Sequence, residues 1–340
     1  MEQVQMKEPL VSVMMTAYNH APFIGKAIQG ILQQEVSFPY ELVIGEDCST
    51  DGTREIVIEY QRKFPDIIQV ITSDKNVGMK KNAHRTGKAC RGKYIAYCEG
   101  DDYWHHPGKL QIQANYLESH PECGLVYSSC DVYLGRGKRI EDFLKYRKWE
   151  MPRTLSISEI VEGKDEHGFC GIYTCTVMVR RILREQVREA DPYLHQSDQF
   201  LMGDLQLWAE IATMAELHCI PESLATYNAT GESASRSKDV KKTLRFDISG
   251  SEVRLYLCRK YDLSPRIRDR YEFTWCDGSL RLAFHSGNAE LSDEVRRRKK
   301  RFTWKEWLLY YGGRNRAIYH IWCVAAWFRA LSKKGDIPWL

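Results

Sequence analysis

The chain has 340 residues and a mass of 39.6 kDa, and 43% of its residues are hydrophobic while 28% are charged. This balance, with a mean hydropathy of −0.47, excludes collagen-like, low-complexity and wholly disordered classes and is typical of a globular protein with a sizeable core. The net charge of +4 is spread unevenly, because residues 296–334 carry 12 Lys or Arg against one acidic residue, whereas residues 1–295 carry a net charge of −6.

Targeting signals and disulfide patterns are not evident in the sequence. No run of about 18 uncharged apolar residues is present to span a bilayer, and the first ten residues lack the basic and apolar regions of a signal peptide. The eleven cysteines include no CxxC pair, which predicts reduced thiols rather than a disulfide framework or a four-ligand zinc site. We therefore expect a cytoplasmic protein.

The first part of the chain alternates short apolar runs with helical periodicity. Strands are predicted at 10–18, 40–45, 67–72, 93–98 and 124–130, and helices after Pro22 and at 51–63, 80–90 and 107–119. This alternation predicts an α/β fold with a mostly parallel, doubly wound, Rossmann-like sheet, whose ligands bind at the carboxyl ends of the strands.

The alternation fades after Leu134. Residues 135–165 are charged and irregular, 171–181 have the pattern of another strand, and 203–215 have that of a helix with a polar start. Residues 239–285 show Leu, Tyr and Phe at helical core spacing, which predicts a helical C-terminal extension.

Acidic residues fall where the predicted strands end. They are Glu46-Asp47, the run Glu99-Gly100-Asp101-Asp102, and Asp204 at the start of a later helix. Crowded carboxylates repel one another unless a cation neutralises them, and an all-oxygen set suits magnesium or manganese. The alternative for each cluster is a turn or a helix N-cap, and for Asp204 a cap and a chemical role are compatible.

The loop 48–53 supplies Ser, Thr and Asp as possible helix caps, and this structural role alone could explain it. Neither a P-loop nor a GxGxxG motif is present. A phosphate ligand would therefore need the metal ion.

Six segments in this order and spacing resemble the inverting glycosyltransferases of family 2, which have the GT-A fold. They are TAYNH (16–20), IGEDCSTDGT (44–53), NVG (76–78), GKYIAYCEGDDYW (92–104), Lys109-Leu110 and GDLQLW (203–208). The resemblance covers about residues 10–235 and is strongest to the bacterial branch with GEDCSTD and EGDDYW motifs.

The resemblance implies a role for each matching residue. The base and ribose of a nucleotide-diphosphate sugar would be held by Thr16, Tyr18, Asn19 and Asp47. Glu99 would face the ribose or a metal-bound water, and Asp101 would ligate Mn²⁺ or Mg²⁺. Asp102 would contact these residues rather than the metal ion itself. Asp204 would be the general base that takes the proton of the acceptor hydroxyl.

The chain departs from the family pattern at two places. It has Ala83-His84 where many relatives have Arg-Asn, and Tyr227-Asn228-Ala229-Thr230 where many have YRxH. The second departure leaves open weaker donor affinity, substitution by Arg236 or Lys238, or a non-catalytic relative. Thr174-Cys175-Thr176 resembles the strand beside the acceptor site, although a buried strand explains it equally well.

The C-terminal tail combines basic and aromatic residues. RRRKKR (296–301) is followed by a helical pattern at 317–331, about 22 Å long and too short to cross a bilayer, and the tail contains Trp304, Trp307, Trp322 and Trp327. This composition predicts binding to an anionic membrane surface. The alternatives are a helical pair packed on the catalytic domain and, less favoured without a recognition module, nucleic-acid binding.

Three parts are therefore predicted: residues 1–238 as a GT-A nucleotide-sugar-binding and catalytic domain, 239–295 as a helical segment packing on it, and 296–340 as a basic, Trp-rich amphipathic tail. The expected function is metal-dependent, inverting transfer of a hexose or amino sugar, with UDP-sugar as the expected donor, to a glycan or polyprenyl-linked acceptor. The resemblance implies cell-surface polysaccharide synthesis at the inner face of the cell membrane, with no nucleic-acid partner. The alternative is a non-catalytic nucleotide-sugar or glycan-binding scaffold recruited to membranes.

Overall fold

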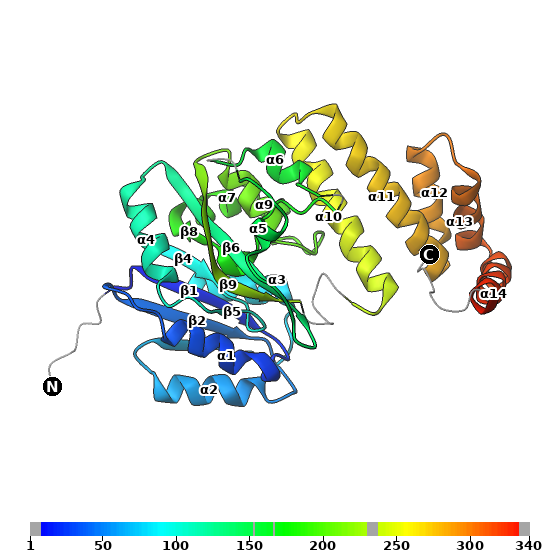
Figure 1. Cartoon of the computed structure of the whole chain (residues 1–340). Coiled ribbons are helices and arrows are strands. Elements are labelled where there is room, and N and C mark those ends of the chain that lie inside the picture. Colours follow the sequence, from blue (N-terminus) through cyan, green and yellow to red (C-terminus); the bar gives the residue numbers. More distant parts are fainter. Residues whose placement is uncertain (1–7, 152–153, 166, 230–236, 333–340) are drawn as a thin grey trace. The chain divides into compact units, whose positions relative to one another are not determined.

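The computed structural model describes residues 8–151, 154–165, 167–229 and 237–332 (Figure 1). The chain divides into two compact units, Met1–Thr230 and Gly231–Leu340. Two residues singled out by the family comparison, Thr230 and Arg236, lie outside the described residues, as do the chain ends at 1–7 and 333–340 and the side chain of Trp327.

The first unit is built on one mixed sheet, which has nine strands in the described part of the chain. The strand order is β3-β2-β1-β4-β8-β6-β9-β5, with β7 paired to β6. The strands are β1 (Val11–Ala17), β2 (Tyr40–Glu46), β3 (Ile68–Ile71), β4 (Tyr94–Tyr97), β5 (Tyr103–Trp104), β6 (Cys123–Gly135), β7 (Lys138–Ile140), β8 (Met178–Arg180) and β9 (Glu216–Asn228).

Helices of the first unit connect these strands. They are α1 (Ala21–Leu32), α2 (Thr53–Lys63), α3 (Met79–Ala89), α4 (Lys109–Ser119), α5 (Phe143–Tyr146), α6 (Ile157–Glu162), α7 (Arg181–Ala190), α8 (Pro192–Gln196) and α9 (Asp204–Ile211), with a 3₁₀ turn η1 (Thr174–Thr176). Pro22 lies in the first turn of α1, where its missing N–H costs nothing. Helix α4 was predicted to start at Pro107 and begins two residues later, at Lys109.

The half of the sheet from β3 to β4 is parallel, as the alternation of strands and helices predicts. Strand β1 pairs in parallel with β2 on one side and with β4 on the other, and α1 and α2 lie next to each other below this half in Figure 1. The side chains of β4 are all buried, which explains why its sequence is a continuous apolar run. The predicted α/β class is therefore confirmed.

The other half of the sheet is mixed, and the predicted strand at 171–181 is wrong in most of its length. Gly171 has a φ of +95°, and the backbone N–H groups of Thr176 and Val177 close the 3₁₀ turn η1 on Tyr173 and Thr174. Only the three residues of β8 then pair, antiparallel to both β4 and β6. Helix α7 begins at once with Arg181.

Strand β9 is long, lies inside the sheet and is not predicted by the sequence pattern. It pairs in parallel with β6 over most of its length, with register shifts at Ser128 and Ser129 of β6. Pro221 lies at the matching point of β9, where a residue without an N–H interrupts the ladder. The pairing matters for function because it carries Asn228, at the end of β9, to the acidic run that follows β4.

The second unit is helical, as predicted. Its described helices are α10 (Val240–Lys260), α11 (Pro265–Ser286), α12 (Ala289–Arg298), α13 (Trp304–Arg314) and α14 (Arg316–Ser332). Helix α13 packs closely on α11, since a Cβ at Gly312 would lie 2.3 Å from the Phe284 ring. The basic run 296–301 starts inside α12, so the predicted boundary at 295/296 falls within a helix.

No described helix has both the length and the apolar character required to cross a membrane.

Candidate functional site

The ends of β1, β2 and β4 meet at one edge of the sheet. The Gly100 N–H donates to the carbonyl oxygen of Thr16 at 3.1 Å, and the Asp47 N–H donates to that of Ala17 at 3.0 Å. Asn19 joins the loop after β2, because its Oδ1 accepts from the Thr50 N–H at 2.9 Å. The structure thus brings the segments that carry Thr16, Asn19, Asp47 and the acidic run together.

Two residues predicted to hold the nucleotide differ in their surroundings. Tyr18 is 44% exposed, so its ring is available at the surface. Asp47 is buried and accepts from the backbone N–H groups of Val77 at 2.8 Å and Gly78 at 2.9 Å. Both carboxylate oxygens of Asp47 therefore order the NVG turn, and any contact with a base would use their remaining lone pairs.

The carboxylates of the acidic run are crowded and partly buried. Oε2 of Glu99 is buried without a hydrogen-bond partner. Burial, and after it the carboxylates of Asp101 and Asp204, raise the pKa of Glu99 to about 8. Burial, followed by Asp101 and Glu99, also raises the pKa of Asp102, whose Oδ1 accepts from the Asn228 N–H at 2.8 Å.

Asp204 lies near this cluster although it is about a hundred residues further along the chain. Its charge contributes to the raised pKa of Glu99. It is the first residue of α9, and its Oδ2 accepts from the Thr174 hydroxyl at 3.2 Å. The N-cap of α9 is Gly203, so the alternative that Asp204 is the helix cap is wrong. The exposed carboxylate of Asp204 is thus held by η1 at the start of α9, close enough for its charge to act on Glu99.

The donor set fits a hard divalent cation that shares its ligands with a phosphate. Within the described residues, no three His, Cys, Asp or Glu side chains are arranged to hold a metal ion on their own. Magnesium and manganese, however, commonly use one or two carboxylates and complete their shell with substrate phosphates and water. The buried Glu99 oxygen without a hydrogen-bond partner is the observation here that fits such a cation.

Sequence analysis missed a group of basic side chains close to this edge. The buried Arg184 of α7 donates from Nε to the Tyr97 hydroxyl at 2.9 Å, and the Tyr97 ring packs edge-on against Trp208 of α9 at 5.5 Å. Nη2 of Arg188 lies 3.1 Å from Nδ1 of His84. No motif marks α7, and only the spacing of Arg184 and Arg188 on one helix face could have indicated the group.

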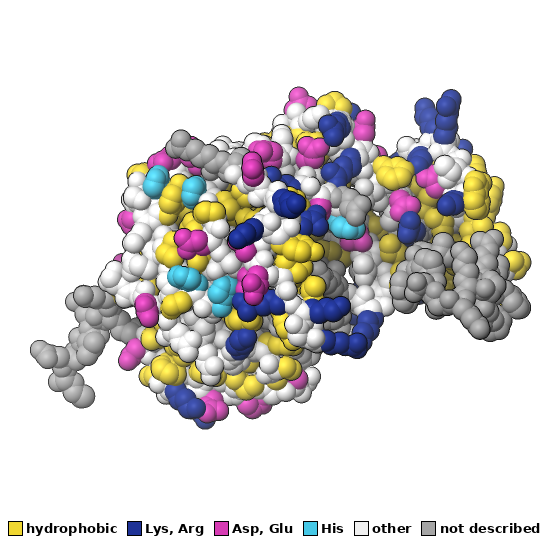
Figure 2. All heavy atoms as spheres, in the orientation of Figure 1, with side chains coloured by type: hydrophobic (Ala, Val, Ile, Leu, Met, Phe, Trp, Pro, Cys, Tyr) yellow, Lys and Arg dark blue, Asp and Glu magenta, His cyan; other side chains and the backbone are white. Residues whose placement is uncertain are grey.

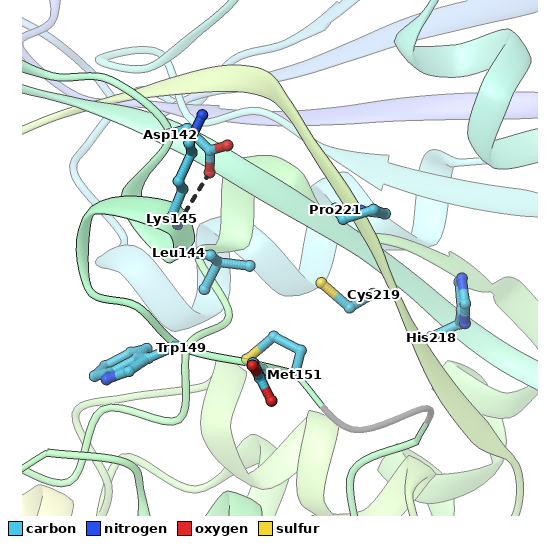
Figure 3. Close-up of a pocket in the computed structure, with 9 residues that line it drawn as sticks. Asp142, Leu144, Lys145, Trp149, Met151, His218, Cys219 and Pro221 are labelled. Atoms are coloured by element: carbon cyan, nitrogen blue, oxygen red, sulfur yellow. Dashed lines mark hydrogen bonds between the residues drawn. The ribbon is translucent and has the colours of Figure 1, made fainter.

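A separate hollow of about 630 Å³ opens near α5 (Figure 3). Its wall includes Leu144, Trp149, Met151 and Cys219, with charged groups from Asp142, Lys145 and Glu150. None of the residues predicted for nucleotide, metal or base lines this hollow.

Comparison with known proteins gives the family. Residues 12–186 match the model of Glycosyl transferase family 2, which is half of the chain. An uncharacterized protein of Mycobacterium tuberculosis, Rv1520, is 31% identical over 224 residues, which cover 64% of this chain and 58% of that protein. The UDP-Glc:alpha-D-GlcNAc-diphosphoundecaprenol beta-1,3-glucosyltransferase WfgD of Escherichia coli is 24% identical over 260 residues, covering 76% of this chain and 92% of that protein.

The fold has solved counterparts as well. The mannosyltransferase PcManGT from Pyrobaculum calidifontis, solved with GDP-Man and Mn²⁺, superposes with a TM-score of 0.54 at 14% identity over 93% of this chain and 86% of that chain. The likeness is one of fold, which is GT-A-like. The resemblance to the family is therefore confirmed, and the chain belongs to glycosyltransferase family 2.

Proposed function

We propose that this chain transfers a hexose or amino sugar from UDP to a glycan or lipid-linked acceptor, with inversion at the anomeric carbon and with the help of Mn²⁺ or Mg²⁺. The main support is that the ends of β1, β2 and β4 meet at one edge of the sheet, and that Thr174 holds Asp204 where its charge acts on Glu99. WfgD is named for a UDP-glucose donor and a diphosphoundecaprenol-linked acceptor, and PcManGT was solved with Mn²⁺.

The donor would bind across the ends of β1, β2 and β4. Thr16, Tyr18, Asn19 and Asp47 would hold the base and ribose, and Glu99 would face the ribose from the next strand. Asp101 would ligate the cation, and Asp102 would fix the acidic run through its contact with Asn228. A bound Mn²⁺ or Mg²⁺ would neutralise the developing charge on the leaving diphosphate.

Asp204 would act as the general base. The acceptor hydroxyl forms a bond to the anomeric carbon while the bond from that carbon to the diphosphate oxygen breaks, and the hydroxyl proton passes to the Asp204 carboxylate. Attack on the face opposite the leaving group inverts the configuration. The hydrogen bond from Thr174 would hold the carboxylate in one orientation during this step.

A transfer and hydrolysis assay tests this proposal. Wild-type protein is incubated with Mn²⁺ and a panel of UDP- and GDP-sugars, and sugar release and transfer are followed by mass spectrometry. We expect activity with at least one UDP-sugar and a loss of roughly 10²–10⁴-fold for Asp204→Asn. Wild-type rates in Asp204→Asn would refute the base assignment, and donor binding with neither hydrolysis nor transfer would favour a non-catalytic scaffold.

We also propose that the second unit attaches the enzyme to an anionic membrane surface, at the inner face of the cell membrane. Lys300, Arg301 and Lys305 are exposed, and Trp304 between them is 73% exposed. Such basic and aromatic residues favour the headgroup region of an anionic bilayer. On the face shown in Figure 2, Lys and Arg side chains lie among acidic ones.

Vesicle sedimentation tests the membrane proposal. We expect the full chain to sediment with vesicles containing 30% phosphatidylglycerol and not with pure phosphatidylcholine, and the combined variant Lys300→Glu, Arg301→Glu and Lys305→Glu to stay in the supernatant. Equal sedimentation of this variant would contradict the assignment. Replacing the exposed Arg259, Lys260 and Arg268 in the same unit by Glu is the matched control for charge.

A further inference from the structure

We propose that the hollow near α5 is an acceptor subsite, which takes a sugar ring of the acceptor glycan other than the ring that carries the attacking hydroxyl. This inference rests on the proposed transferase function. The hollow measures about 630 Å³ and combines Trp149, Met151 and Leu144 with charged groups at its rim. Figure 3 shows Leu144, Met151 and Cys219 around the open space, with Asp142 and Lys145 at one side.

The chemistry of the wall suits a sugar. A pyranose ring has an apolar face of C–H groups, which packs on an aromatic ring, and a rim of hydroxyls, which needs polar partners. Trp149 supplies a half-buried ring, while Lys145 and Glu150 are exposed at the rim. A prenyl chain would desolvate these charged groups without giving them a hydrogen-bond partner, so the wall favours the hydroxylated ligand.

The hollow is linked to the base by a short stretch of chain. A Cβ at Gly171 would lie 3.2 Å from Cε of Met151 and 3.8 Å from Cε3 of Trp149, so Gly171 is in contact with the wall. Three residues later, Thr174 donates to Asp204. Three residues span at most about 11 Å, which is the scale of a short oligosaccharide.

Aromatic rings continue the wall toward the base. Trp149 packs edge-on against Phe143 at 5.7 Å, and Phe143 packs edge-on against Tyr173 at 5.3 Å. Tyr173, which immediately precedes Thr174, also lies 4.7 Å from the Tyr227 ring of β9. Each of these rings is only partly buried. An acceptor with its hydroxyl at Asp204 would therefore meet a row of ring surfaces on its way to the hollow.

Transfer to acceptors of increasing length tests the subsite. The donor is the sugar nucleotide identified in the assay above, and the acceptors are glycosides of one, two and three sugars of one series. In the wild type we expect kcat/KM to rise with length. In Trp149→Ala the gain in kcat/KM from the one-sugar to the three-sugar acceptor should be about tenfold smaller, while Trp149→Phe should keep most of this gain. The matched control is Tyr146→Ala, which removes an exposed aromatic ring of α5 that does not line the hollow.

Two kinetic outcomes would overturn the subsite. One is a wild-type kcat/KM that does not depend on acceptor length. The other is an equal loss for one-sugar and three-sugar acceptors in Trp149→Ala, which would indicate a structural role for the ring.

Binding without donor keeps the subsite testable if no transfer is found. Saturation-transfer NMR of a panel of trisaccharide glycosides should show contact in the wild type and in Tyr146→Ala, and loss of contact in Trp149→Ala. Binding of a trisaccharide without sugar transfer would contradict the proposed function but would still support a glycan-binding subsite. Binding of no trisaccharide, equal contact in the wild type and in Trp149→Ala, or displacement of the trisaccharide from the wild type by farnesyl phosphate would overturn the subsite.

Discussion

The hydroxyl of Thr174 donates a hydrogen bond of 3.2 Å to Oδ2 of Asp204, and this contact joins the 3₁₀ turn η1 to the first residue of α9. The other carboxylate oxygen, Oδ1, accepts from the N–H of Leu205 at 2.7 Å. The side chain is thus held at both oxygens.

Replacing Thr174 by Val should therefore reduce kcat. The carboxylate loses one of two orienting donors, and we expect a loss of about tenfold, the scale of one hydrogen bond to a charged group. Nucleotide affinity, measured by calorimetry, should stay within a factor of two of the wild type, and Thr174→Ser should restore the rate. A Thr174→Val enzyme with wild-type kcat would show that Thr174 does not position the base.

Replacing Asp101 by Ala should weaken nucleotide binding only when the metal is present. Since Asp101 is the proposed ligand, we expect UDP affinity in Mn²⁺ to fall roughly 10- to 100-fold and affinity in excess chelator to be unchanged. Isothermal calorimetry measures both. Asp269→Ala, which removes an exposed carboxylate in the second unit, is the control, and an equal loss with and without Mn²⁺ would contradict the assignment.

Lys109 should make the stability of the first unit depend on pH. Its Nζ is fully buried, donates to Oε1 of Gln113 at 2.6 Å and lies 4.2 Å above the Trp104 ring. Burial lowers the pKa of Lys109 to about 7 from 10.5. Between these values the unfolded chain binds more protons than the folded one, so the free energy of unfolding should rise with pH, by up to about 4 kcal/mol across the window.

Urea unfolding at pH 7, 8 and 9 checks this effect. Lys109→Met keeps the aliphatic volume and removes the titrating group, so it should be more stable than the wild type at pH 7 and should approach it at pH 9. Parallel stability profiles for the two proteins would mean that Lys109 does not titrate in this range. The quantity to compare is the difference in free energy of unfolding between the two proteins. Burial raises the pKa values of Cys90 and Cys123, so these thiols also make stability depend on pH, but equally in both proteins.

Gly30 should not tolerate a side chain, whereas Gly25 on the same helix should. A Cβ at Gly30 would lie 2.5 Å from the backbone oxygen of Trp104, and this backbone cannot move without shifting β5. Gly30→Ala should destabilise by about 1–3 kcal/mol. Gly25→Ala meets nothing closer than the Tyr60 hydroxyl at 3.9 Å and should stabilise by about 0.5–1 kcal/mol. Urea midpoints measure both, and equal midpoints would contradict the close contact.

The parallel half of the sheet could be predicted because β1, β2 and β4 are almost entirely buried on both faces. Such strands appear as continuous apolar runs, and the turn residues between them mark the boundaries. In the mixed half, β6 was predicted at 124–130, whereas β8 was covered only by the overlong strand at 171–181 and β5 was not predicted. These two strands have three and two residues, too few for any periodicity. Strand β9 was missed because Pro221 interrupts its strand pattern in the sequence. In the structure, register shifts in the partner strand β6 allow the pairing to continue past this proline.

The roles of the site residues remain predictions. Motif order pointed to Glu99, Asp101 and Asp204, and the structure adds that the charge of Asp204 acts on Glu99. The partner of Asp204 is Thr174, which sequence analysis placed in a strand rather than in the turn that aims its hydroxyl. The hollow at Trp149 could not be predicted, because its wall combines residues of 142–151 with residues 218–221 of β9, which are distant in the sequence.

The contact between Asp102 and Asn228 joins residues 126 positions apart, and it depends on β9 being inserted between β6 and β5. During synthesis, the parts of the site on β1, β2 and β4 emerge well before this strand. Until residue 228 has left the ribosome, β6 presents an unpaired edge, and long-range pairing of this kind is slow. Completion of the acidic run thus waits for the last strand of the first unit, and nascent chains that stop short of it should be those most in need of a chaperone.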